Sequence, residues 1–253
     1  MNALQDTWLV FGRSMKLSLR NPVWVIFGLI QPILYLTLFG PLLKAVASAP
    51  GFPPGDSWQV FVPGLLVQLG IFGAVFVGFG LIAEWRAGVI ERMRVTPASR
   101  ASLLVGRMLR DVLVLIVQAT ILVGAATLFG LRVPFESFLV GLAIVAMLGA
   151  AFSALSYGVA LKLKSEDSFA PVVNGVLLPM LLLSGILLPM SLAPGWLQTV
   201  ADVNPLTHVV DGVRAVFRGE VGSPDAMLGL AITVALVVLG VLFGTRVFRR
   251  ESA

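Results

Sequence analysis

The chain alternates between long apolar runs without charge and shorter segments that carry its charged residues. Six runs contain no Asp, Glu, Lys, Arg or His: Val23–Leu43, Trp58–Ala83, Val112–Leu131, Phe138–Leu161, Phe169–Pro189 and Met227–Thr245. At a rise of about 1.5 Å per residue, each run can cross about 30 Å of hydrocarbon as a helix. The pattern therefore predicts an all-α polytopic membrane protein with six transmembrane helices.

The other segments place these spans within one domain, residues 1–253, because no repeat or long linker divides the chain. The spans, with flanking residues, are expected at 22–46, 58–83, 111–131, 137–161, 168–189 and 226–246. Residues 1–21 are predicted to form an amphipathic interfacial helix, since apolar residues recur at steps of three and four: Leu4, Trp8, Phe11, Met15 and Leu19. Two longer connections remain, a loop at 84–110 and an outer segment at 190–225.

Composition excludes several classes of protein. With 58% hydrophobic residues, 12% charged residues and a mean hydropathy of +0.97, the chain is unlike a soluble domain. The absence of Cys excludes disulfides and thiolate sites. The single histidine, His208, is expected to be a surface residue of an outer loop. No catalytic motif is present, so we expect neither enzyme chemistry nor a metal site in this chain.

The net charge of +5 is distributed unevenly. With six spans both termini face one compartment, and 14 of the 18 Lys and Arg residues lie on that side. This asymmetry follows the positive-inside rule and predicts that both termini are cytoplasmic. It explains the basic charge without nucleic acid. The 14 Arg against four Lys are typical of a GC-rich bacterial genome, so we expect the bacterial plasma (inner) membrane.

The polar and aromatic residues of the spans allow two interpretations. Gln68 and Asn174 either form hydrogen bonds between helices or line a substrate path. Phe72 and Phe76 lie among glycines of the second span, where they either pack in the core or against lipid or line an apolar route. Small residues also recur at every fourth position in the fourth and sixth spans, and they favour close packing within one subunit or between two copies.

The energy source is a further question. A carrier driven by an ion gradient usually holds an ionisable residue inside the membrane, at a cost of about 2.5–3.5 kcal/mol at the centre. The six runs hold none. The sequence also lacks the G-x-x-x-x-G-K-[ST] phosphate loop of an ATPase. We therefore expect a separate motor protein to supply the energy.

The loop 84–110 holds six of the 14 cytoplasmic basic residues. Apolar residues recur along one helical face: Trp85, Val89 and Met93. Thr96 and Pro97 are then expected as N-cap and first position of the helix that becomes the third span. The loop is either a docking surface for another protein or an ordinary positive-inside loop.

The outer segment 190–225 is too apolar for a free loop and too interrupted by proline for a span. It is predicted to form two short amphipathic helices, the second beginning with Asn204 and Pro205. Asp211 can pair with Arg214 three residues later. These helices either re-enter the outer leaflet as a lid over an emerging substrate or anchor the chain at the interface.

Two groups of residues resemble motifs of a known family: Gly88–Pro97 followed by Arg100, Gly106 and Arg107, and Asn204–His208 followed by Asp211 and Arg214. The first group is similar to the coupling-helix region of ABC-2 type permeases, and the second to that family's segment before the last span. The resemblance covers nearly the whole chain. It is strongest to drug-export permeases of the daunorubicin-resistance type, while permeases for polysaccharides share the architecture.

The resemblance implies a pair of permease chains, expected to be identical, which binds two copies of an ABC ATPase subunit. ATP and magnesium would bind to that subunit only. Residues implied to couple with the ATPase are Glu84, Gly88, Glu91, Arg92, Arg94, Thr96 and Pro97. Residues implied to line the substrate path, on the second and fifth spans, are Gln68, Phe72, Phe76, Asn174 and Met180. The outer re-entrant motif comprises Asn204, Pro205, Asp211 and Arg214.

The sequence thus predicts the permease subunit of an ATP-driven exporter that moves an amphiphilic or hydrophobic substrate out of the cell. Three alternatives remain open: an ABC-2 permease for a polysaccharide or lipid-linked glycan, a stand-alone carrier driven by a gradient, and a membrane subunit without cargo.

Overall fold

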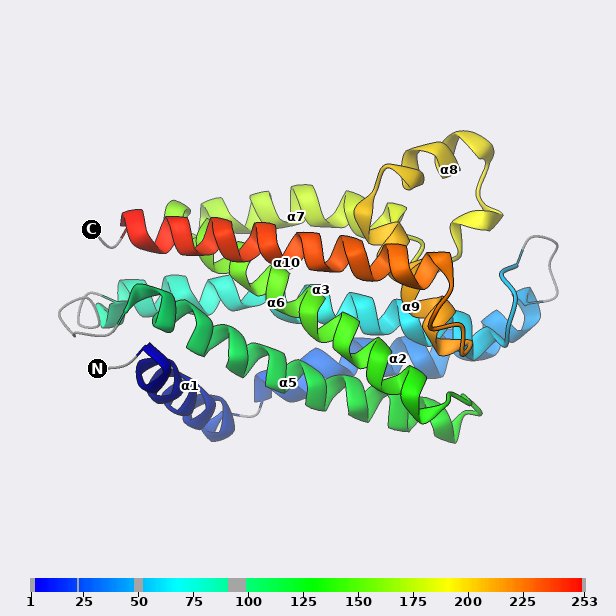
Figure 1. Ribbon diagram of the computed structural model, residues 1–253, viewed down its shortest axis with the longest axis horizontal. Coiled ribbons are helices and arrows are strands. Elements are labelled where there is room, and N and C mark those ends of the chain that lie inside the picture. Colours follow the sequence, from blue (N-terminus) through cyan, green and yellow to red (C-terminus); the bar gives the residue numbers. More distant parts are fainter. Residues whose placement is uncertain (1–2, 22, 48–51, 91–98, 252–253) are drawn as a thin grey trace.

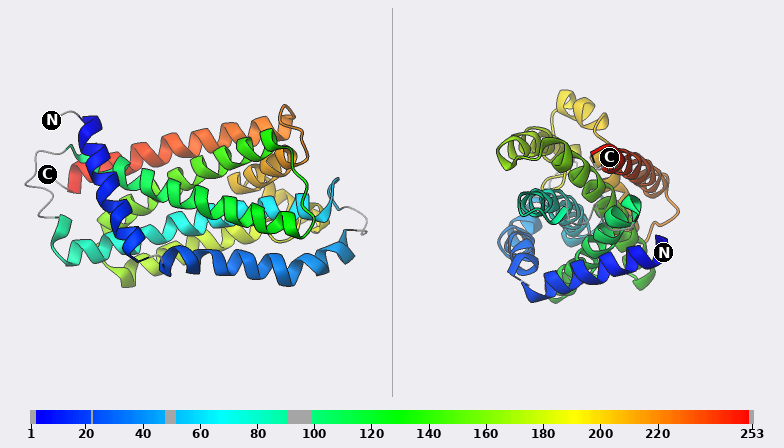
Figure 2. Two further views of the ribbon diagram at one scale, coloured as in Figure 1. Left: turned by 90° about the horizontal axis from the view of Figure 1, so that it is seen from below. Right: turned by 90° about the vertical axis from the view of Figure 1, so that its left-hand side faces the viewer.

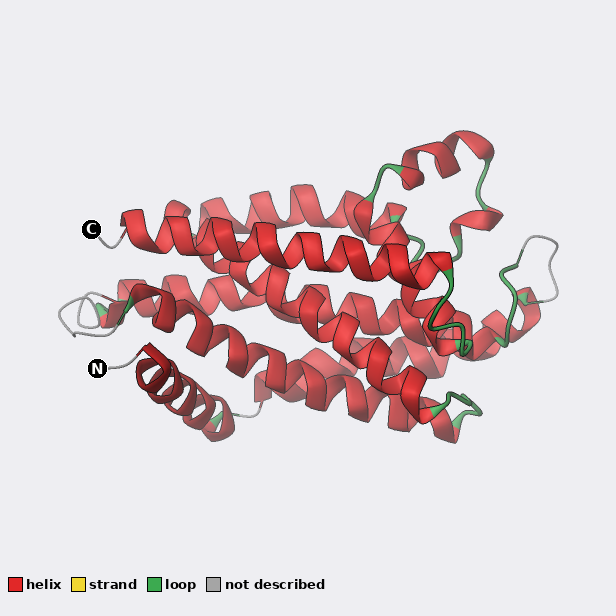
Figure 3. Cartoon of the chain, viewed as in Figure 1, coloured by secondary structure: helices red, strands yellow, loops and turns green. Residues whose placement is uncertain are grey.

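The computed structural model describes residues 3–21, 23–47, 52–90 and 99–251 of the protein. In these residues all regular structure is helical, without a β-strand (Figure 3). The elements are α1 (Ala3–Arg20), α2 (Val23–Val46), α3 (Ser57–Arg86), α5 (Arg100–Leu128), α6 (Phe135–Leu163), α7 (Glu166–Leu183), the 3₁₀ turn η1 (Met190–Leu192), α8 (Gly195–Asp202), α9 (Pro205–Phe217) and α10 (Pro224–Glu251).

Six of the described helices are long and apolar enough to cross a membrane: α2, α3, α5, α6, α7 and α10. They run side by side in one bundle, and both chain termini lie at the same end of it (Figure 1). We call this end the N/C end and the opposite end the far end. The predicted all-α fold with six spans is confirmed.

Helix α3 forms the centre of the bundle. Of the 18 most apolar consecutive residues in α3, 67% are buried, compared with 17% in α7 at the periphery. Helix α9 packs against α3, α6 and α10 at the far end, and ten of its 13 residues are buried. The segment predicted as a lid or an interfacial anchor therefore divides into an exposed α8 and an α9 that is part of the core.

The small residues of α6 and α10 pack against each other within one subunit. A Cβ added at Gly240 would lie 2.6 Å from the carbonyl oxygen of Ala151, and one added at Gly244 would lie 2.9 Å from that of Ala154. Gly158 faces Phe243 in the same contact. Such distances leave no room for a side chain, so glycine is what allows the two backbones to approach.

Helix α5 differs in its start from the sequence prediction. It begins at Arg100 and is capped by Ser99, whose hydroxyl accepts a hydrogen bond from the N–H of Ser102 (3.1 Å). The predicted start at Pro97, with Thr96 as cap, was wrong because a second capping residue lies three positions on; those two residues lie outside the described ones. The helix nevertheless begins before the uncharged run does, so Arg107, Arg110 and Asp111 lie in the first half of a spanning helix.

Helix α7 ends earlier than expected, at Leu183 rather than near residue 189. Gly185 adopts a positive φ of 71°, a conformation that favours glycine and commonly follows a helix end. The apolar residues after it continue the uncharged run but not the helix. The chain between Ser184 and Ile186 is nevertheless buried.

Candidate functional site

At the N/C end, α1 lies across the outside of the bundle and packs on the first half of α5 (Figure 2). Gly106 of α5 lies directly against α1. A Cβ added there would lie 2.8 Å from both the carbonyl oxygen of Thr7 and the Cβ of Val10. Glycine at this position thus sets how α1 crosses α5.

Polar contacts hold both ends of α1 in place. The Asp6 carboxylate is 3% exposed and accepts a hydrogen bond from the backbone N–H of Ser99 (3.3 Å), just before α5 begins. At the other end, Arg110 donates a hydrogen bond to the hydroxyl of Ser18 (3.1 Å). Helix α1 is therefore fixed to the part of α5 that follows the loop.

An ion pair joins the two ends of the loop. Arg107 in α5 donates to Glu84 in the last turn of α3 (2.5 Å), and the guanidinium is 6% exposed. A buried charge is strongly destabilising without its partner, so this pair fixes α3 and α5 relative to each other. Glu84, one of the predicted coupling residues, thus lies at the base of the loop.

A second charged cluster lies deeper in the bundle at the same end. Arg110 pairs with Asp111 (3.0 Å), and the hydroxyl of Tyr157 in α6 donates to the same carboxylate (2.5 Å). The Asp111 side chain is only 7% exposed. The uncharged runs predicted an interior without fixed charge. This prediction holds only in part, because Asp111 of α5 places a paired charge inside the bundle.

Contacts to the start of α7 complete the N/C end. Arg86 at the end of α3 pairs with Glu166 at an exposed position (3.4 Å), and the ammonium of Lys164 lies 4.7 Å from the centre of the Trp85 ring. Gly88, a predicted coupling residue, has a positive φ of 68°. The other predicted coupling residues lie outside the described residues: Glu91, Arg92, Arg94, Thr96 and Pro97.

The predicted path residues occupy different environments. Gln68 is 7% exposed inside the core, and its Oε1 has no hydrogen-bond partner in the described structure. Phe76 is 50% exposed on α3 and stacks with the half-buried Phe72, with ring centroids 5.9 Å apart. On α7, Asn174 is exposed and Met180 is half-buried. The five residues therefore do not share one environment within the subunit.

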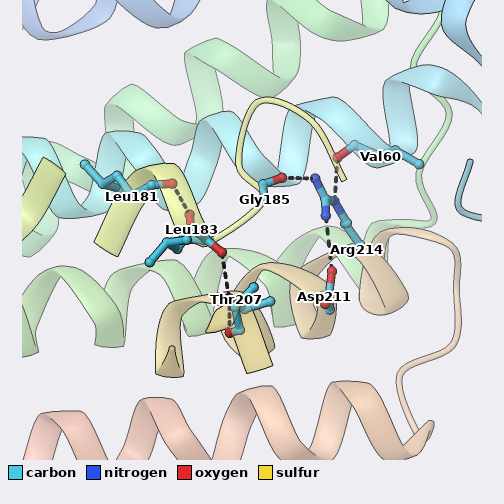
Figure 4. Close-up of polar contacts among 9 residues, drawn as sticks. Val60, Leu181, Leu183, Gly185, Thr207, Asp211 and Arg214 are labelled. Atoms are coloured by element: carbon cyan, nitrogen blue, oxygen red, sulfur yellow. Dashed lines mark hydrogen bonds and ion pairs between the residues drawn. The ribbon is translucent and has the colours of Figure 1, made fainter. Parts of the chain in front are cut away.

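At the far end, Arg214 of α9 joins three segments of the chain (Figure 4). Its guanidinium donates to the carbonyl oxygen of Val60 in α3 (2.9 Å), to that of Gly185 after α7 (2.6 Å) and to the carboxylate of Asp211 (3.1 Å). The side chain is 3% exposed. Every acceptor suits the planar fork of arginine, so the buried charge is well satisfied.

Two further side chains at the start of α9 bind the end of α7. Asn204 donates to the carbonyl oxygen of Met180 (2.7 Å) while its own Oδ1 caps α9. The hydroxyl of Thr207 lies within hydrogen-bond distance of the carbonyl oxygens of Leu183 (3.1 Å) and Ala201 (2.9 Å). The last carbonyl groups of a helix have no intrahelical partner, and these donors supply one. We call Asn204, Thr207 and Arg214 the α9 clamp.

A cavity of about 250 Å³ lies beside the clamp. Its lining residues are Pro53, Pro54, His208, Asp211, Arg214, Arg218, Asp225 and Leu228. His208 is half-buried in α9, with Nε2 2.9 Å from the carbonyl oxygen of Asp202, and not on a loop as predicted. Burial raises the pKa of the Asp211 carboxyl above its ordinary value, and the Arg214 guanidinium opposes this rise.

Sequence reasoning identified the motif of the clamp but missed its burial. The sequence places Arg214 in the outer segment and predicts only its local pairing with Asp211. The α9 segment is strongly amphipathic, which indicates one buried face but does not by itself place the charged Arg214 in the core. The backbone acceptors in α3 and after α7 have no sequence signature.

Comparison with known proteins places these features in a family. The ABC-2 type transporter family model matches residues 5–217. The chain is 26% identical over 253 residues to the daunorubicin resistance ABC transporter permease protein DrrB1 of Streptomyces coeruleorubidus, covering 99% of this chain and 88% of that protein. It is 27% identical to the putative transport permease ycf38 of Cyanophora paradoxa, covering 85% of this chain and 74% of that protein. It is also 27% identical to the probable doxorubicin resistance ABC transporter permease protein DrrC of Mycobacterium tuberculosis, covering 91% of this chain and 83% of that protein.

Proposed function

Because the chain belongs to the ABC-2 type transporter family, we propose that it is the transmembrane subunit of an exporter driven by a separate ABC ATPase. The observation that carries this proposal is the division of the molecule. Six apolar helices form the body, while a network of ion pairs gathers around the base of one loop at the N/C end. The sequence has no phosphate loop, so ATP-driven transport would need a separate ATPase. The charged N/C end offers a surface to which that ATPase could bind.

The proposed docking surface is the loop 84–110 together with α1. The Glu84–Arg107 pair and the contact of α1 with α5 make one unit of these elements, so a force on the loop would reach α3, α5 and α1 at once. The N/C end then faces the cytoplasm of a bacterium, as the distribution of Lys and Arg indicates. ATP and magnesium bind to the ATPase alone.

The substrate is proposed to be an amphiphilic or hydrophobic compound. Support comes from relatives whose names refer to daunorubicin and doxorubicin resistance and from the uncharged middle of the spans. The route would run between two copies of the chain, beside exposed residues of α3 (Gly73 and Phe76) and of α7 (Asn174). Aromatic and small residues beside such a route suit an apolar ligand.

Measuring ATP hydrolysis of the complex tests the proposal. The permease, co-expressed with candidate ABC ATPase subunits of the same organism and placed in lipid nanodiscs, is expected to bind one of them. Daunorubicin, used as the probe, is expected to raise hydrolysis only when both chains are present. If none of the candidates binds, or if the one that binds has the same activity with and without the permease, the assignment is refuted.

The docking of α1 gives a second prediction. Gly106→Leu should push α1 away from α5, because the new side chain meets Thr7 and Val10. We expect the thermal midpoint to fall by about 2–10 °C, as for an overpacked core, and stimulation by the probe to fall by about tenfold, a loss of about 1.4 kcal/mol. Differential scanning fluorimetry and the hydrolysis assay measure the two effects.

Gly12→Leu is the matched control, since a Cβ at Gly12 of α1 has no neighbour within 4 Å. It should behave like the wild type in both assays. Normal stimulation in Gly106→Leu would mean that the position of α1 does not matter for coupling.

A further inference from the structure

Helix α7 makes few contacts along its middle. Only Phe169, Leu177 and Leu181 of its 18 residues are buried. Pro171 and Pro179 each remove a backbone N–H from the helix, which weakens it at two points. Because little packing fixes the middle of α7, the contacts at its two ends determine its position in the bundle.

At the N/C end, α7 is attached to α3. Phe169 is fully buried, packs at Gly78 and meets the Phe79 ring edge-on with centroids 4.9 Å apart. The Arg86–Glu166 pair joins the same two helices at the surface. The attachment is therefore mainly apolar packing on the central helix.

At the far end, α7 is attached to α3 a second time, through the α9 clamp. The Arg214 guanidinium binds the carbonyl oxygens of Val60 in α3 and Gly185 after α7 at the same time. Next to it, a Cβ added at Gly64 would collide with the carbonyl group of Ile186, so the backbone after α7 lies directly on α3. Asn204 and Thr207 bind the last carbonyl groups of α7 itself.

We propose that the α9 clamp positions α7, so that α3 and α7 move as one body during transport. Arg214, Thr207 and Asn204 are then positioning residues: they act through α7 and need not touch the substrate. The inference rests on the proposed function, in which α3 receives the movement of the loop. Helix α7 would follow α3 because it is held at both ends, without a contact of its own to the ATPase.

Hydrogen–deuterium exchange of the complex in nanodiscs tests this proposal. Peptides covering residues 181–189 report on the segment that the clamp holds. In the wild type, their protection is expected to be equal without nucleotide and after trapping with ATP and vanadate. A loss of protection in the trapped state would mean that the clamp opens in the cycle, and would overturn the proposal.

Two variants test the residues themselves. Thr207→Val keeps the shape of the side chain but removes the hydroxyl, and Arg214→Gln removes the guanidinium. Each is expected to make residues 181–189 exchange about tenfold faster, while peptides of α6 and α10 stay protected. If Arg214→Gln does not fold, Thr207→Val alone decides. Unchanged exchange at 181–189 in the folded variants would refute the role of the clamp.

Matched controls separate positioning from a general loss of polar groups. Thr199→Val removes an exposed hydroxyl of α8 that bonds within its own helix, and Arg218→Gln removes a guanidinium of the same α9 end that pairs with Glu220. Neither should alter exchange at 181–189. If ATP changes no peptide anywhere in the wild-type chain, the proposed function fails, whereas the variants still test the clamp.

Discussion

Replacing Glu91 and Arg92 together by alanine is expected to leave the permease folded and to abolish the stimulation of ATP hydrolysis by substrate. The two residues belong to the segment that resembles the family's coupling region, and their charges are proposed to contact the ATPase. The expected loss of stimulation is at least about tenfold, or about 1.4 kcal/mol. Hydrolysis by the complex in nanodiscs, with and without daunorubicin, measures it.

The control for this variant removes a similar pair of charges from the other end of the molecule. Arg132, between α5 and α6, and Glu136, in the first turn of α6, are both exposed at the far end. Alanine at both should preserve stimulation, because these positions lie away from the proposed docking surface. If the loop variant keeps normal stimulation, or if both variants lose it equally, the loop is not the coupling element.

The second large effect is expected from Gly64→Val, which should prevent correct folding of the far end. A Cβ at this position of α3 collides with the backbone carbonyl of Ile186, and a backbone group cannot move aside as the tip of a flexible side chain can. We expect a loss of about 3 kcal/mol or more of unfolding free energy and a thermal midpoint lower by about 10 °C. The yield of monodisperse protein and its thermal midpoint in detergent measure the effect.

Gly73→Val tests whether the effect belongs to the contact rather than to valine in a helix. Gly73 lies on the same helix, and a Cβ there has no neighbour within 4 Å. Its midpoint should stay within about 2 °C of the wild type, which corresponds to the roughly 0.5 kcal/mol typical of surface substitutions. Equal loss in both variants would contradict the close packing of the chain after α7 on α3.

The spans could be predicted because a membrane imposes a strong and simple rule. A run of about 20 residues without charge is needed to cross it, and six such runs are visible in the sequence. The ends of the spans are less well determined. Ser99, and not Thr96, caps α5. Both residue types are good N-caps, so the sequence alone does not show which of the two starts the helix.

The end of α7 shows a different limit. Ile186, Leu187 and Leu188 extend the apolar run beyond Gly185, and hydrophobicity alone does not distinguish a helix from an apolar loop buried on its neighbour. The stop depends on the conformation of one glycine and on donors from α9 more than 20 residues later. Such long-range hydrogen bonds leave no pattern in a single sequence.

The charged residues of the site could be identified from the sequence, but most of their partners and their burial could not. The family resemblance included both Glu84, as a coupling residue, and Arg107, as part of the motif, but their pairing could not be predicted from it. Arg214 belonged to a recognised motif, but its burial depends on acceptors in two other segments. The path residues stay a prediction, because a route between two copies involves surfaces that one subunit leaves open.

We propose that this permease moves its substrate only when a separate ATPase drives it. Transport of daunorubicin into inside-out proteoliposomes is the most direct test, comparing the permease with its ATPase and ATP against the permease alone under an imposed proton or sodium gradient. Daunorubicin should accumulate in the first case and not in the second. Accumulation by the permease alone, driven by an ion gradient, would contradict this proposal.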